Sequence, residues 1–158
     1  AAAAACGKTE AYRDTALTPA GVRQAAGLGQ YVTGTTPMPE LVIVSPLRRA
    51  VETASLAFGA LSPRNGFYFL ATELARERVG HATCDWRSPR SVLELTYPHV
   101  DFTLLEHDED HIWASKEDQP STKFSTKCAL RGLALLEWLH HSRPERRLAV
   151  VSHWVFLK

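Results

Sequence analysis

Two short apolar runs in the sequence are each followed closely by side chains that can bind an anion. Residues 41–44 (Leu-Val-Ile-Val) lead into Arg48 and Arg49, and residues 148–151 (Leu-Ala-Val-Val) lead into His153. If both runs are parallel strands, their carboxyl ends lie at the same edge of the sheet, where open α/β sheets bind ligands. Helix N-termini at that edge add free N–H groups and a positive dipole end. The arrangement therefore predicts a phosphate site.

Each of these residues also has a simpler interpretation. Arg48 and Arg49 could be surface cations at the start of a helix, and His153 could be a hydrogen-bonded histidine at a strand end. A helix N-terminus disfavours positive charge unless an anion lies nearby, which weakens the first interpretation. Taken together, the arginine pair and the histidine favour an anion site.

Alternating strand and helix patterns surround these residues. Apolar runs predict strands at Leu41–Val44, Phe67–Leu70 and Leu148–Val151. Capping signals and apolar periodicity predict helices over about Pro19–Val32, Leu47–Phe58 and Ser125–His141, with short helices between Gly80 and Thr122. In the last long helix an apolar stripe is expected to lie on the sheet, formed by Leu130, Leu133, Ala134, Leu136 and Trp138. We expect an α/β fold, with a single domain over residues 1–158, three α/β/α layers and a doubly wound, mostly parallel sheet.

Composition and charge limit the classes of partner. The 158 residues carry a net charge of +1, which gives no reason to expect general capture of nucleic acid. No apolar run approaches the roughly 20 residues needed to cross a bilayer, so no transmembrane segment is expected. Cys6, Cys84 and Cys128 are far apart and odd in number, so no disulfide framework is expected. A reducing compartment, the cytoplasm or an organelle matrix, is favoured.

Several motifs in order give the sequence a family resemblance. They are Leu17-Thr18-Pro19-Ala20-Gly21, Ser45 to Ala54 (Ser-Pro-Leu-Arg-Arg-Ala-Val-Glu-Thr-Ala), Arg76-Glu77-Arg78-Val79-Gly80 with Cys84-Asp85, Tyr97 to Phe102, Asp108-Glu109-Asp110 with Trp113, and Val150-Val151-Ser152-His153. With these motifs the chain resembles the histidine phosphatase, or phosphoglycerate mutase-like, superfamily, and within it the plant and fungal branch. The likeness extends over nearly everything from Tyr12 to Leu157.

The resemblance implies a role for several residues. Arg49 would be the second phosphate-binding arginine of the family, whose planar fork holds two phosphoryl oxygens. His153 would be the second histidine, which donates to the phosphoryl group and stabilises charge in the transition state. Glu77 is the best match for the general acid that protonates the leaving oxygen, and Glu73 is the runner-up. The implied reaction is hydrolysis of a phosphomonoester, on a small molecule or a phosphoprotein, without metal or cofactor.

One departure from the family pattern is important. The family's nucleophile is the histidine of an Arg-His motif, which forms a phosphohistidine, and no Arg-His pair occurs in this sequence. Either Ala5 and Cys6 stand at the motif's two positions, or the motif lay upstream of Ala1 in a chain truncated at both ends. Two functions are therefore expected: a phosphatase, or a catalytically inactive pseudo-phosphatase that serves as a ligand binder or a structural or interaction subunit with partner chains.

Overall fold

The computed structural model describes residues 9–35, 37–59, 68–79, 82–115 and 126–158. In these residues the centre is a parallel sheet with the strand order β3-β2-β1-β4. The strands are β1 (Leu41–Val44), β2 (Tyr68–Ala71), β3 (Val100–Asp101) and β4 (Leu148–Val151). Val44 is paired with Ala71 on one side and with Val151 on the other, so three strands end level at one edge. The bounds predicted for β1 and β4 are confirmed.

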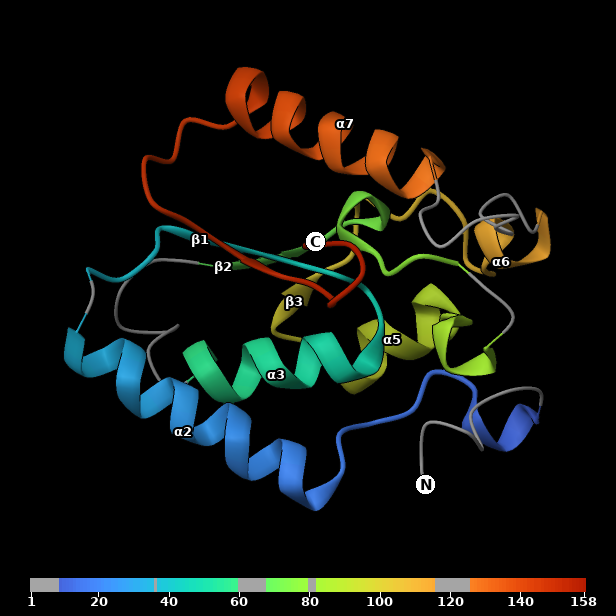
Figure 1. Cartoon of the computed structure of the whole chain (residues 1–158), viewed down its shortest axis with the longest axis horizontal. Helices are drawn as coiled ribbons and strands as arrows, with labels where there is room; N and C mark the ends of the chain where they lie inside the picture. The colour runs from blue at the N-terminus through green and yellow to red at the C-terminus, as the bar shows by residue number, and fades with distance from the viewer. Residues whose placement is uncertain (1–8, 36, 60–67, 80–81, 116–125) are drawn as a thin grey trace.

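Helices cover both faces of this sheet and form three layers (Figure 1). The helices α2 (Pro19–Thr35), α3 (Arg48–Phe58) and the short α5 (Arg90–Thr96) lie on one side, and α7 (Thr126–Ser142) lies on the other. The predicted three-layer, doubly wound α/β fold is confirmed. Among the described helices, none combines the length and the apolar character that a membrane span requires.

Side chains of β1 alternate between the two cores because successive residues of a strand point to opposite faces. Val42 and Val44 pack on the α3 side, whereas Leu41 and Ile43 pack on the α7 side. All four are fully buried, as a strand in the middle of a covered parallel sheet requires. The β-branched run is therefore explained by burial on both faces.

The helix α2 packs mainly on α3. A Cβ atom on Gly29 would lie 2.9 Å from the carbonyl oxygen of Leu56, so the two helices approach closely at this glycine. The buried face of α3 follows helical spacing and consists of Ala50, Val51, Ala54, Ala57 and Phe58. This apolar face holds α3 on the sheet, and Arg48 and Arg49 stand in the first turn of the helix.

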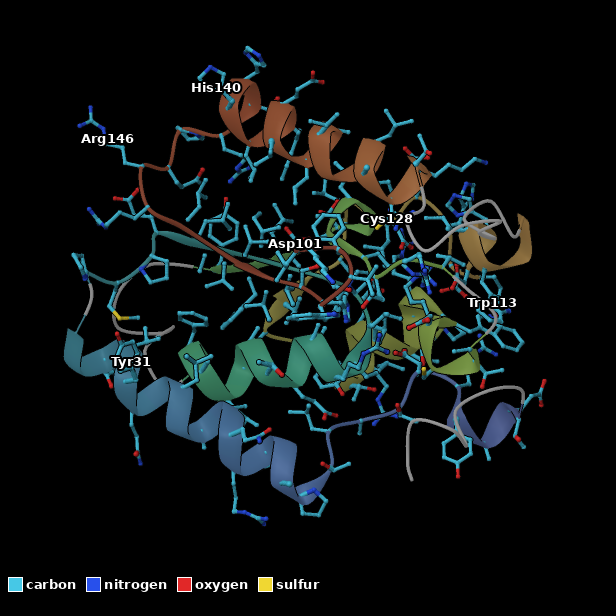
Figure 2. The ribbon with its side chains drawn as sticks, viewed as in Figure 1. Tyr31, Asp101, Trp113, Cys128, His140 and Arg146 are labelled. Atoms are coloured by element: carbon cyan, nitrogen blue, oxygen red, sulfur yellow. The ribbon has the colours of Figure 1, made fainter. Side chains whose placement is uncertain are left out.

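The predicted buried stripe of α7 is largely wrong. Leu130, Leu133 and Leu136 are 57%, 58% and 63% exposed. The residues that face the sheet are instead the buried Cys128 and Leu135, together with the half-buried Leu139. Of the predicted stripe, Trp138 is half-buried and also packs on this side. Figure 2 shows Cys128 on the inner side of the helix and His140 pointing away from the sheet. Leucines occur all round this helix, so periodicity alone did not select the correct face.

The middle of the chain contains short helices, as predicted, and one strand that the sequence did not indicate. The short helices of this region are the 3₁₀ turn η4 (Thr83–Asp85), α5, and α6 (His111–Ser115). Two further 3₁₀ turns, η1 (Glu10–Tyr12) and η3 (Glu73–Ala75), lie outside it. The additional strand is β3, which pairs with β2 through only two residues and therefore gives a weak sequence pattern.

Candidate functional site

The ends of β1 and β4 meet at the carboxyl edge of the sheet, as the sequence predicts. The backbone N–H of Ser45, which follows β1, donates to the carbonyl oxygen of Val151 at 3.0 Å. The side chain of Ser45 forms a hydrogen bond of 2.7 Å with Nε2 of His153. Which of the two atoms donates depends on the tautomer of the imidazole. The histidine is therefore anchored to the strand that leads into the arginine pair.

His153 is a buried and neutral imidazole. Only 7% of the residue is exposed. The pKa of His153 is lowered to about 3, first by burial and then by the positive charges of Arg49 and Arg76. At neutral pH the ring is uncharged, so one nitrogen carries a proton that it can donate. The surroundings of this ring are positive and would favour an anion.

Arg49 lies in the first turn of α3 and points toward the segment that contains η4. Its guanidinium donates to the carbonyl oxygen of Cys84 at 2.6 Å and to Oδ1 of Asp85 at 2.9 Å. Burial raises the pKa of Asp85, although the neighbouring Arg49 opposes this rise. The positive charge of Arg49 also lowers the pKa of His153, so these two predicted residues are close enough to interact electrostatically. Both terminal nitrogens of the arginine are, however, already bonded within the protein.

The other arginine of the pair does not belong to this group. Arg48 Nε donates to the hydroxyl oxygen of Tyr97 at 3.3 Å, and Nη2 lies 3.8 Å from the carboxylate of Glu52. The hydrogen bond that Arg48 donates to Tyr97 raises the pKa of Arg48. Of the two adjacent arginines, the structure brings only Arg49 to the histidine.

Glu77 reaches the same place from the end of η3. Its Oε2 accepts a hydrogen bond of 3.4 Å from the backbone N–H of Val155, two residues after His153. Its negative charge also contributes to the raised pKa of Asp85, so the carboxylates of Glu77 and Asp85 lie near each other. The residue that the resemblance marks as general acid therefore contacts the segment that follows the histidine.

The runner-up, Glu73, has a different position. One carboxylate oxygen forms an ion pair with Arg76 at 3.1 Å, and the other forms one with Arg87 at 2.8 Å. Both arginine side chains are fully buried, and the carboxylate of Glu73 is mostly so. Because both of its carboxylate oxygens pair with buried guanidinium groups, Glu73 is a structural ion-pair residue.

Arg76 is a site residue to which sequence reasoning assigned no role. Its guanidinium binds the carboxylate of Asp110 through both terminal nitrogens. The network places a fixed positive charge close enough to His153 to lower its pKa. The adjacent pair Arg76-Glu77 was visible in the sequence. The pairing with Asp110, 34 residues away, had no sequence signal.

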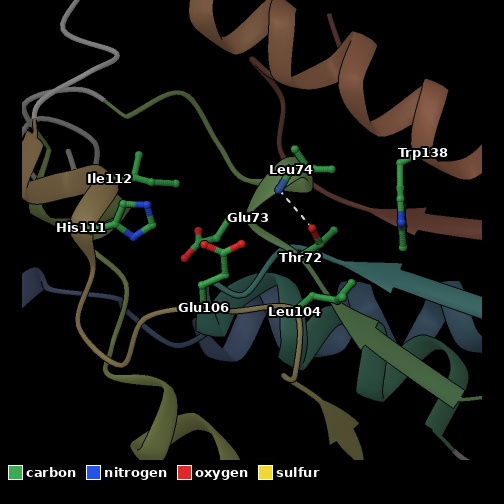
Figure 3. A pocket seen from close by; sticks show the side chains of 8 residues that line it. All are labelled: Thr72, Glu73, Leu74, Leu104, Glu106, His111, Ile112 and Trp138. Carbon is green, nitrogen blue, oxygen red and sulfur yellow. Dashed lines mark hydrogen bonds between the residues drawn. The ribbon is translucent and has the colours of Figure 1, made fainter. Parts of the chain in front are cut away.

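A cavity of about 350 Å³ lies nearby but does not contain the predicted site residues. Its lining consists of Thr72, Glu73, Leu74, Leu104, Glu106, His111, Ile112 and Trp138 (Figure 3). Glu73 belongs both to this wall and to the ion-pair network that holds Arg76. The cavity therefore adjoins the network, and the oxyanion position inferred from Arg49 and His153 is separate from it.

Among the cysteines of the described residues, Cys128 is a buried free thiol. The alignment of Ala5 and Cys6 with the Arg-His motif falls outside the described residues. Within the described residues, no group of three histidine, cysteine, aspartate or glutamate side chains is arranged to hold a metal ion.

Comparisons with known proteins give a consistent family. A model described as the histidine phosphatase superfamily (branch 1) matches residues 2–65. A phosphoglycerate mutase-like protein of Arabidopsis thaliana is 34% identical over 176 residues, which cover 94% of this chain and 63% of that protein. A probable phosphoglycerate mutase of Arthroderma benhamiae is 35% identical over 112 residues, covering 66% of this chain and 33% of that protein.

A solved structure supports the same fold. The ecdysone phosphate phosphatase of Bombix mori, in complex with tungstate, matches with a TM-score of 0.62 at 18% identity. The match covers 89% of this chain and 53% of the phosphatase. At this identity the likeness concerns the fold. The chain spans less than two thirds of the length of each of these three proteins.

Proposed function

The chain belongs to the histidine phosphatase superfamily, and on that premise we propose that it supplies the phosphate-binding side of a phosphomonoester hydrolase. The substrate would be a phosphorylated small molecule or a phosphoprotein, and the resemblance implies no metal or cofactor. The observation that carries the proposal is the position of His153, a buried neutral imidazole that is hydrogen-bonded to Ser45 and lies within electrostatic reach of Arg49 and Arg76. An oxyanion at this point would accept hydrogen bonds and balance the positive charge.

Each of the three residues has a defined part in this proposal. Arg49 and His153 bind phosphoryl oxygens and stabilise the charge that develops on them. Glu77, whose carboxylate lies beside the backbone that follows His153, protonates the leaving oxygen as its bond to phosphorus breaks. The phosphoryl group passes to a nucleophilic histidine and then to water, as in the intact family.

Binding requires Arg49 to change or share its present partner. Its Nη2 is bonded to Asp85, whose pKa is already raised by burial. An arriving oxyanion would raise that pKa further because like charges repel. Asp85 can then take up a proton and release the guanidinium, which turns its planar fork to the phosphoryl oxygens.

A second candidate rests on the absence of an Arg-His pair from the 158 residues. On this account the protein binds a phosphorylated ligand, or serves as a structural subunit with partner chains, and does not hydrolyse. One simple observation distinguishes the two candidate functions. The phosphatase requires an in-frame Arg-His pair upstream of Ala1 in the transcript, and the pseudo-phosphatase does not.

Hydrolysis of 4-nitrophenyl phosphate by the full-length protein tests the proposal. We expect turnover that tungstate inhibits and that His153→Ala lowers on the order of 10²-fold or more, because a charge-stabilising donor is lost. His140→Ala is the matched control, since this histidine is exposed at the outer end of α7. Equal rates for His153→Ala and the unaltered protein would rule out the phosphatase assignment of this site. Tungstate binding without turnover would favour the second candidate.

A further inference from the structure

Asp14 is a fully buried carboxylate in a segment that precedes α2. Its backbone has φ of 43°, in the left-handed region that aspartate and asparagine tolerate better than most residues. Its Oδ1 accepts a hydrogen bond from the backbone N–H of Arg48, and its Oδ2 accepts one from the backbone N–H of Ser88, each at 2.8 Å. One side chain thus joins two segments that are 40 residues apart in the chain.

The first of these segments is the start of α3. Leu47, the residue before the helix, offers no side-chain cap to the free backbone N–H groups of the first turn. Asp14 caps one of them, that of Arg48, from a distant part of the chain. The first turn of α3 also carries two arginines, which the helix dipole disfavours. The buried carboxylate of Asp14 at this point stabilises the turn electrostatically.

The second segment is the one that holds the side chain of Arg49. The guanidinium of Arg49 is bonded to the carbonyl of Cys84 and to the carboxylate of Asp85, a few residues before Ser88. Arg49 therefore starts from one of the segments that Asp14 joins and ends on the other. The distance between the start of α3 and residues 84–88 therefore decides where the guanidinium of Arg49 lies relative to His153.

We propose that Asp14 is a positioning residue, which holds the start of α3 against residues 84–88 and thereby places Arg49 for oxyanion binding. Only its consequence for binding depends on the proposed function; the positioning itself does not. In the intact protein the carboxylate uses both oxygens, one for each segment. Asparagine has a single acceptor oxygen, so its NH₂ group would face one of the two backbone N–H groups.

The test measures the position of Arg49 through its effect on His153. In full-length protein, the pKa of the His153 imidazole is followed by NMR in the unaltered protein, in Asp14→Asn and in Asp14→Gly. Asparagine and glycine both tolerate the left-handed backbone, so neither variant adds strain there. We expect the pKa of His153 to rise in both variants, because the positive charge of Arg49 moves away. Tungstate should bind about tenfold more weakly, as expected for the loss of a hydrogen bond to a charged group.

Asp108→Asn is the matched control. Asp108 accepts hydrogen bonds from the backbone N–H of Ser91 at 2.7 Å and from its hydroxyl at 3.2 Å at the start of α5, away from Arg49. Its variant should leave the pKa of His153 and the tungstate affinity unchanged. A folded Asp14→Asn protein with an unchanged His153 pKa would overturn the positioning role. Failure of the unaltered protein to bind tungstate would instead count against the proposed function, because the pKa comparison needs no ligand.

Discussion

A decrease in pH from 7 to 5 should destabilise the fold through His153 specifically. The ordinary pKa of histidine is 6.5, and in the folded protein that of His153 is lowered to about 3. As the pH falls below 6.5, the unfolded chain takes up a proton at this residue and the folded chain does not. The stabilising contribution is therefore complete above pH 6.5 and is lost progressively as the pH falls toward 3.

The expected magnitude follows from the distance between the ordinary pKa and the chosen pH. At pH 5 the folded ring is still neutral and the unfolded ring is almost fully charged. This pH lies about 1.5 units below the ordinary pKa of histidine. At about 1.4 kcal/mol per unit, the loss at pH 5 is about 2 kcal/mol. This is a large part of the stability of a typical domain, so it can be measured.

Urea unfolding followed by tryptophan fluorescence provides the assay, with His153→Gln as the reference. Glutamine can keep a hydrogen bond to Ser45 but does not titrate, so other titrating groups contribute equally to both proteins. The unaltered protein should lose about 2 kcal/mol more than the variant between pH 7 and pH 5. Equal losses, or an NMR titration of His153 near 6.5, would refute the conclusion that the ring is buried beside two guanidinium groups.

Two further predictions concern packing and the buried ion pairs. Asp110→Ala should lower the free energy of unfolding by about 3–5 kcal/mol, measured by urea denaturation, because Arg76 would keep a buried charge without its main partner. A loss below 1 kcal/mol would contradict the role of this pair. Gly29→Ala should cost about 1–3 kcal/mol, since the new Cβ would lie 2.9 Å from a backbone oxygen of α3. A Cβ atom on Gly27 would have no neighbour within 4 Å, so Gly27→Ala should instead stabilise α2 by up to about 1 kcal/mol. Equal melting temperatures of the two variants would contradict the close packing of α2 on α3 at Gly29.

Much of the fold could be predicted because the informative signals were local. The runs 41–44 and 148–151 are short and continuously apolar, and each occupies a strand with the expected bounds. Adjacent parallel strands bring their carboxyl ends to one edge, so the common starting edge of the segments with Arg49 and His153 followed from the topology. The role assigned to Glu77 came from the resemblance.

The remaining features depend on contacts between distant residues. The pairing of Arg76 with Asp110 and the bridge that Asp14 forms between Arg48 and Ser88 leave no periodic pattern in the sequence. The orientation of α7 was missed for another reason. Its leucines surround the helix, and the packing of Leu135 with Trp138 and Leu139 shows which face is buried.

Arg49 and His153 must share a single oxyanion position for the proposed chemistry to occur. The most direct measurement is the pKa of the His153 imidazole by NMR, with and without saturating tungstate, in the unaltered full-length protein and in Arg49→Met. We predict that tungstate raises this pKa in the unaltered protein, because a bound anion stabilises the charged ring. Methionine at position 49 should abolish both the tungstate binding and the rise. A pKa that does not respond to bound tungstate, or that responds equally in Arg49→Met, would contradict the account.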